Sequence, residues 1–138
     1  MHFSNAMLIC CGNDHFTAGL ELTRGLHTIL SSEMASIHFN PGGGFGASLE
    51  WLTVTGGIEQ VWKKRLEIAK KLGIKKIILV DDFPCSAYEE SFGKMTPDEE
   101  KEQHLEAIAA ARKFFAQHAP KMEFVAYLLN GESPTKIA

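Results

Sequence analysis

The stretch that decides the fold is IKKIILV, residues 74–80, in which apolar residues, most of them β-branched, surround two lysines. A run of this kind, without the alternation of a half-exposed strand, is typical of a strand buried on both faces of a parallel sheet. Gly73 comes directly before it and Asp81-Asp82 directly after it. The sequence therefore predicts a central parallel strand at 74–80.

A helix is predicted on each side of this strand. The first ends at Gly73, a residue favoured just beyond a helix C-terminus. The second begins at Thr96-Pro97-Asp98-Glu99, which combines a capping hydroxyl, a proline in the first turn and acids near the positive end of the helix dipole. It is expected to end before Pro120. The apolar positions assigned to these helices are Ile58, Val61, Trp62, Leu66, Ala69 and Leu72 in the first, and Leu105, Ile108, Ala111 and Phe115 in the second.

Further strands and helices complete an alternating pattern. Strands are predicted at 7–11, 35–39 and 122–129, and a helix from Thr17 to about Leu30. Alternation of this kind predicts an α/β fold with a mostly parallel sheet flanked by helices. We expect one domain over residues 7–138, with residues 1–6 resembling a cloning scar.

Composition narrows the class of protein. The chain has 138 residues, of which 45% are apolar and 22% charged, and its net charge of −3 gives no basic face for nucleic acid or an anionic membrane. No apolar run approaches the roughly 20 residues of a membrane span, and no signal peptide is recognisable. The protein is therefore expected to be soluble and cytoplasmic. Its three cysteines are then expected as free thiols or metal ligands rather than as disulfides.

Two of the thiols follow predicted strands. Cys11 ends the first strand, and Cys85 follows the central strand in the sequence Asp82-Phe83-Pro84-Cys85. Ligands of parallel sheets gather at the carboxyl ends of the strands, and thiolates bind Zn²⁺ at about 2.3 Å. A zinc site is one interpretation. The alternative is that these cysteines are buried as small apolar residues.

The order of these motifs resembles the β-class carbonic anhydrases. That family has Cys-x-Asp-x-Arg after its first strand, then an Asn-Ala-Gly loop, then His-x-x-Cys after a buried strand. The present chain has CGNDH at 11–15, NPGG at 40–43 and DFPC at 82–85, in the same order. The resemblance implies a β-carbonic-anhydrase-like fold, Zn²⁺ as cofactor, CO₂ and bicarbonate as substrates, and Cys11, Asp82 and Cys85 as metal ligands.

The chain also departs from that family at the site. Asp82 replaces the zinc histidine, and Asn13 and His15 replace the Asp–Arg pair. Asn13 and His15 would then orient water or carry protons. A carboxylate in place of a neutral imidazole makes the site more negative, which raises the pKa of bound water and weakens hydration of CO₂ at neutral pH.

Other interpretations remain open at the level of sequence. The chain could be a non-enzymatic relative with a binding or regulatory role, or a small anion- or nucleotide-binding domain that uses the glycine loop at 42–46. Asp81-Asp82 could be solvated turn residues or helix caps, and apolar surface around Phe45 and Trp51 could support a homodimer. Three histidines are expected at ordinary surface positions of helices: His27, His104 and His118.

Overall fold

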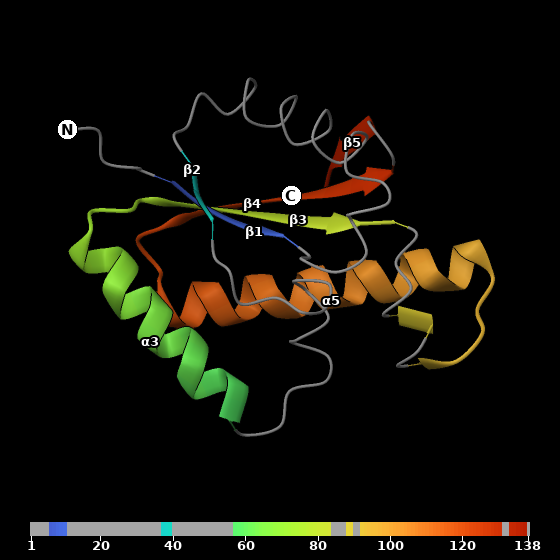
Figure 1. Ribbon diagram of the computed structural model, residues 1–138, viewed down its shortest axis with the longest axis horizontal. Coiled ribbons are helices and arrows are strands. Elements are labelled where there is room, and N and C mark those ends of the chain that lie inside the picture. The colour runs from blue at the N-terminus through green and yellow to red at the C-terminus, as the bar shows by residue number, and fades with distance from the viewer. Residues whose placement is uncertain are drawn as a thin grey trace.

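The computed structural model describes residues 6–10, 37–39, 57–83, 88–89, 92–130 and 133–137. Within these residues a single sheet has the strand order β2-β1-β3-β4-β5, and two long helices accompany it (Figure 1). The elements, in chain order, are β1 (Ala6–Cys10), β2 (Ile37–Phe39), α3 (Gly57–Lys71), β3 (Lys76–Asp82), α5 (Pro97–His118), β4 (Glu123–Asn130) and β5 (Ser133–Lys136).

The sheet is mostly parallel, as predicted. β2, β1, β3 and β4 run parallel to one another, and β5 pairs antiparallel with β4 at the edge. β3 is the central strand, although it begins two residues later than the predicted 74–80. β5 was not predicted. It contains Pro134, and proline is accepted in a strand mainly at a sheet edge.

The end of α3 explains how the chain enters β3. Gly73 has a φ of 78°, its N–H donates to the carbonyl of Lys70, and the Ile74 N–H donates to the carbonyl of Ala69. These two bonds form a Schellman motif, in which a glycine accepts the left-handed conformation without strain. Ile74 is buried beyond the cap, whereas Leu72 is 44% exposed. Leu72, which the sequence assigns to the apolar positions of this helix, lies one residue beyond its end at Lys71.

α5 begins as predicted, with a capping box. The Glu99 N–H donates to the Thr96 hydroxyl, the Thr96 N–H donates to the Glu99 carboxylate, and Pro97 occupies the first turn. The buried stripe of the helix differs from the prediction, because Leu105 is 36% exposed and His104 takes its place. Among the described residues, no helix combines the length and apolar character needed to cross a membrane.

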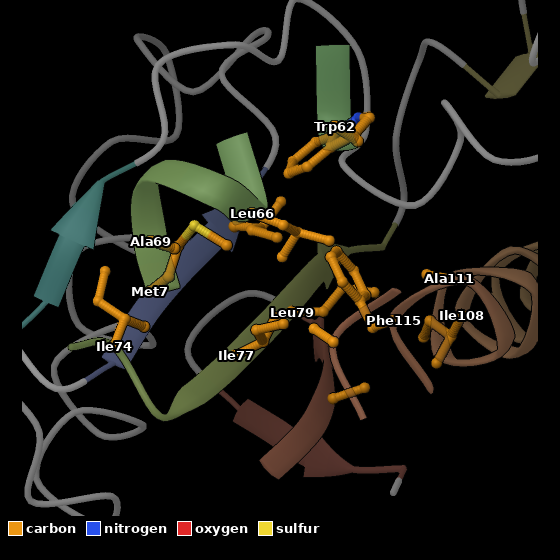
Figure 2. Close-up of a cluster of buried hydrophobic side chains, with 13 residues drawn as sticks. Met7, Trp62, Leu66, Ala69, Ile74, Ile77, Leu79, Ile108, Ala111 and Phe115 are labelled. Atoms are coloured by element: carbon orange, nitrogen blue, oxygen red, sulfur yellow. The ribbon is translucent and has the colours of Figure 1, made fainter. Parts of the chain in front are cut away.

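Two apolar clusters lie on opposite faces of the sheet. The larger one packs α3 and α5 against one face of the sheet through Trp62, Leu66, Ile77, Leu79 and Phe115, among others (Figure 2). Because side chains alternate along a strand, the other face of β3 carries a second set. That cluster consists of Ala6, Leu8, Ile78, Val80, Val125, Tyr127 and Leu129.

Of the features predicted for the first half of the chain, one boundary can be compared with the structure and two features cannot. Ala6 is fully buried as the first residue of β1, although residues 1–6 resemble a cloning scar in sequence. The predicted helix at 17–30 and the apolar surface around Phe45 and Trp51 lie outside the described residues.

Candidate functional site

The carboxyl ends of β1 and β3 lie side by side. The two strands pair in parallel, and Cys10 stands opposite Val80 in the register. Cys11 is the next residue after β1, and Asp82 is the last residue of β3. The chain therefore leaves both strands at the same edge of the sheet, which is the edge where parallel sheets bind ligands.

Most of the predicted ligands belong to parts of the chain that the structure does not describe. Cys11, Asn13, His15, Cys85 and the loop at 42–46 fall outside the described residues, and of Asp82 only the backbone is described. Within the described ranges, no group of three His, Cys, Asp or Glu side chains could hold a metal ion. The side chains of Cys11, Asp82 and Cys85 are not among the described residues, so that search did not include them and the metal site stays a prediction.

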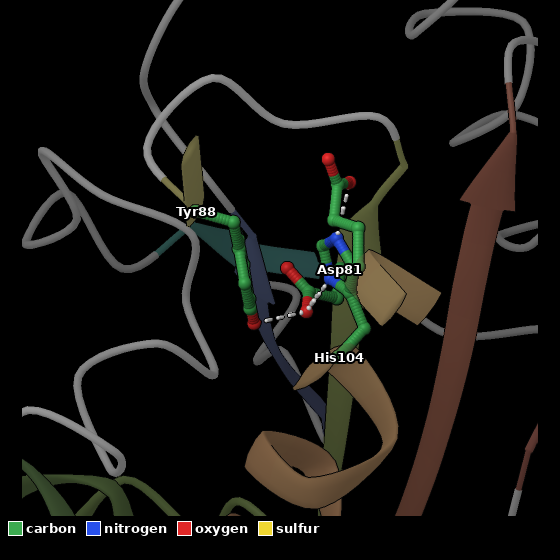
Figure 3. Close-up of polar contacts among 4 residues, drawn as sticks. Asp81, Tyr88 and His104 are labelled. Atoms are coloured by element: carbon green, nitrogen blue, oxygen red, sulfur yellow. Dashed lines mark hydrogen bonds and ion pairs between the residues drawn. The ribbon is translucent and has the colours of Figure 1, made fainter. Parts of the chain in front are cut away.

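The carboxylate that the structure does place at this edge is Asp81. Alternation along β3 puts Asp81 on the face of Ile77 and Leu79, which is the face covered by α5, and Asp81 is completely buried. Its Oδ2 accepts a hydrogen bond from the Tyr88 hydroxyl at 2.8 Å and lies 2.5 Å from Nδ1 of His104 (Figure 3). For Asp81, the interpretation as a solvated turn residue or helix cap is therefore wrong.

His104 joins Asp81 to a second carboxylate. Its Nε2 lies 2.9 Å from Oε2 of Glu100, one helical turn earlier on α5. An imidazole can donate from both nitrogens only when it is protonated. Burial lowers the pKa of His104, but the hydrogen bonds and negative charges of Asp81 and Glu100 outweigh this effect and raise the pKa above its ordinary 6.5. We call Asp81, His104 and Glu100 the buried triad, in which both carboxylates favour the protonated form of His104.

The expectation that His104 occupies a surface position is wrong, because its side chain is fully buried. The sequence of the helix indicates this burial through the spacing of its apolar residues. His104 precedes Ile108, Ala111 and Phe115 by 4, 7 and 11 residues, which is the spacing of one helix face. A polar residue at the start of such a stripe must find partners in the core, and an acid ending a buried strand can supply one.

Aromatic rings enclose the imidazole of His104. The Tyr88 ring lies almost parallel to it, with centroids 3.8 Å apart at 30°, and the Phe83 ring meets it edge-on at 5.6 Å. A protonated imidazole is attracted to the face of an aromatic ring, as other cations are. Tyr88, Glu89 and Phe92 have helical backbone.

The triad has a defined chemical character. Two carboxylates and one imidazole give a charge of about −1 when His104 is protonated and a more negative charge when it is neutral, so the triad favours a cation over an anion nearby. Both imidazole nitrogens are already engaged with carboxylates, so His104 is poorly suited to act as a general base. The arrangement is suited to fixing side chains and backbone at the end of β3.

Comparisons of the chain with protein-family models, with curated proteins and with solved structures find no match. A proposal about function therefore depends on the residues and their arrangement.

Proposed function

We propose that the protein binds Zn²⁺ at the carboxyl edge of the sheet, through Cys11, Asp82 and Cys85, in a domain of the β-carbonic-anhydrase type. The observation that supports this proposal is the parallel pairing of β1 with β3, in which Cys10 stands opposite Val80. In this register the end of β1, directly before Cys11, lies beside the end of β3, which contains Asp82 and precedes Cys85 by three residues in the chain.

The donor set suits zinc. Two thiolates and one carboxylate are ligands that Zn²⁺ accepts, and three protein ligands leave a position open. The buried triad beneath this edge adds negative charge, which favours a bound cation. Two thiolates and one carboxylate around Zn²⁺ give a site of about −1, whereas a histidine in place of Asp82 would give a site close to neutral.

Bound zinc would supply an acidified water molecule for the hydration of CO₂. In that reaction Asn13 and His15 would orient water or carry protons, as the resemblance implies. The negative charge of the ligand set opposes ionisation of the water, so we propose at most weak hydratase activity at neutral pH. This same feature favours a second candidate, a zinc-binding relative without enzymatic activity.

Metal analysis of the protein purified without chelator tests the proposal. We expect one zinc ion per chain in the wild type and none in Cys85→Ala, because a methyl group offers no donor. Cys10→Ala is the matched control, because it removes the neighbouring thiol, which the proposal does not use as a ligand. Zinc retained in Cys85→Ala, or absent from the wild type, would contradict the proposal.

Stopped-flow measurement of CO₂ hydration then separates the two candidates. Zinc with measurable hydration supports a weak hydratase, and zinc without hydration supports the non-enzymatic relative. A protein that binds no zinc but retains inorganic phosphate would favour the anion-binding interpretation of the loop at 42–46.

A further inference from the structure

A groove lies at the end of the sheet where β3 and β4 begin, opposite the carboxyl edge. It has a volume of about 540 Å³ and lies between the end of α3, the start of β3 and the link from α5 to β4 (Figure 1). Its floor is apolar, since Ile74 and Ala119 are buried and Met122 packs against the main core. A groove of this volume and character fits a small organic molecule.

Lysines accompany this apolar floor. Lys70, Lys75 and Lys121 line the groove, and no acid is among the described residues that line it. The acid that follows in the chain, Glu123, pairs with Lys76 at 3.9 Å. Lys75 and Lys121 are exposed, and within the described part of the chain neither of them forms an ion pair.

The balance of charge in the groove is positive, although the net charge of the chain is −3. α3 and α5 both end here, and the C-terminal end of a helix is equivalent to a charge of about −0.5. Three lysines outweigh the two helix ends and leave a charge of about +2. Lys70 serves the end of α5, since its ammonium donates to the carbonyl of His118 at 2.7 Å. Lys75 and Lys121 are therefore the cations available to a ligand.

We propose that this groove binds a small amphipathic anion, a carboxylate that carries a hydrocarbon chain or ring. The hydrocarbon lies against Ile74, Ala119 and Met122, and the carboxylate lies beside the ammonium groups of Lys75 and Lys121. Burial of the hydrocarbon supplies affinity in proportion to the apolar area removed from water, and the lysines select the anion. The groove is at the opposite end of the sheet from the proposed zinc site and does not depend on it.

A neighbouring depression between α3 and α5 is less suited to an anion. It is lined by Lys63, Leu66, Glu67, Lys70 and His118, and its volume is about 220 Å³. Glu67 adds a negative charge to this lining, whereas the described lining of the larger groove contains no acid. The larger groove therefore combines more space with the more favourable charge.

Titration with octanoate, followed by nuclear magnetic resonance of the isotope-labelled full chain in chelator, tests the proposal. Two matched probes divide octanoate into its parts: octanol has the chain without the charge, and acetate has the charge without the chain. We expect saturable shifts in the amides of residues 70–75 and 119–122, at least about tenfold tighter binding of octanoate than of octanol, and no saturable shift with acetate. No saturable shift at these residues, or equal affinity for octanoate and octanol, would overturn the proposal.

Charge reversal tests the two lysines. Lys75→Glu and Lys121→Glu should each lower the affinity for octanoate about tenfold, because an attraction becomes a repulsion. Lys101→Glu is the matched control, since it makes the same change of charge at an exposed position near the start of α5, far from the groove. Equal affinity in the three variants would refute the assignment.

Two milder variants serve if a reversed charge prevents folding. Lys75→Gln and Lys121→Gln only remove the charge, so the affinity for octanoate should fall by a smaller factor in the same direction. Affinity equal to the wild type in both variants would count against the proposal.

Other occupants of the groove would give different results. With a second copy of the chain in the groove, the same amides would shift as the protein concentration rises without any ligand. With an anionic lipid surface, the protein would sediment with phosphatidylglycerol vesicles, lose that binding in Lys75→Glu and Lys121→Glu, and show no saturable shift with octanoate. Either result contradicts the proposal. A wild type that binds no zinc would defeat the proposed function and leave this test unchanged.

Discussion

Nδ1 of His104 lies 2.5 Å from Oδ2 of Asp81, although the two residues are 23 positions apart in the chain and neither side chain is exposed. Removing one partner from a buried ion pair costs about 3 to 5 kcal/mol, because the remaining charge is left without compensation. A domain of this size is stable by only about 5 to 15 kcal/mol. Loss of this contact would therefore remove a large part of the stability of the domain.

The first prediction concerns the dependence of stability on pH. The pKa of His104 is raised above 6.5 in the folded protein, so protonation stabilises the folded state. This contribution is complete below pH 6.5 and is lost as the pH rises through the folded-state pKa. Urea unfolding of the metal-free protein from about pH 6 to about pH 9 should show a falling free energy of unfolding.

Comparison with a variant isolates this contribution from other titrating groups. In His104→Gln the free energy of unfolding should be lower at pH 6.5 than in the wild type, and the difference should shrink toward alkaline pH. His118→Gln should keep the wild-type slope. A difference between wild type and His104→Gln that stays constant across this range would show that the charge of His104 does not stabilise the fold.

The second prediction separates the two neighbouring acids of β3. Asp81→Asn should destabilise the metal-free protein by up to about 3 to 5 kcal/mol, because His104 loses the fully buried one of its two carboxylate partners and keeps only Glu100. Asp82→Asn should lower zinc affinity and leave the stability of the metal-free protein nearly unchanged. Urea unfolding in chelator and zinc competition measure the two effects. Equal losses of stability in both variants would contradict this division of roles.

The third prediction concerns the Schellman cap before β3. Gly73→Ala should destabilise the protein by about 1 to 2 kcal/mol, because an L-residue is strained in the left-handed conformation at a φ of 78°. A Cβ at Gly73 would meet no atom within 4 Å, so the cost comes from the backbone alone. Thermal unfolding measures it, and an unchanged melting temperature would contradict the assignment of strain.

Much of the fold could be predicted from short stretches of sequence, because strands and helix ends depend on neighbouring residues. The apolar run at 74–80 predicted a central strand, and the structure confirms it as β3 with a shift of two residues. Gly73 and Thr96 correctly marked a helix end and a helix start, because caps depend on a few neighbouring residues. β5 was not predicted. It contains Pro134, and proline disfavours a strand except at the edge of a sheet, a position that the sequence does not reveal.

The site was harder to predict because its contacts are distant in sequence. Asp81 and His104 each look ordinary alone, and only the packing of α5 on β3 brings them together. Choosing Leu105 rather than His104 as the first residue of the stripe followed hydrophobicity, since both residues have helical spacing with Ile108. The acid at the end of a buried strand was the clue that a buried partner is required.

The last prediction concerns hydratase activity and follows from the charge of the proposed site. With Asp82 as a ligand, ionising the water would create an anion in a site of about −1, above a buried triad of similar charge. Each unit by which the pKa of the water rises costs about 1.4 kcal/mol and about a tenfold loss of the ionised form at fixed pH. Turnover should therefore be low at neutral pH and rise with alkaline pH in a stopped-flow assay.

Restoring the positive and neutral groups of the carbonic anhydrase pattern should reverse this effect. The triple variant Asp82→His, Asn13→Asp and His15→Arg makes the ligand set nearly neutral, so its activity at neutral pH should exceed that of the wild type by at least about tenfold. Adding Cys85→Ala to the triple variant should abolish the gain, because the metal is lost. Wild-type turnover that is already high at neutral pH, with zinc bound and Asp82 among its ligands, would show that site charge does not limit the reaction.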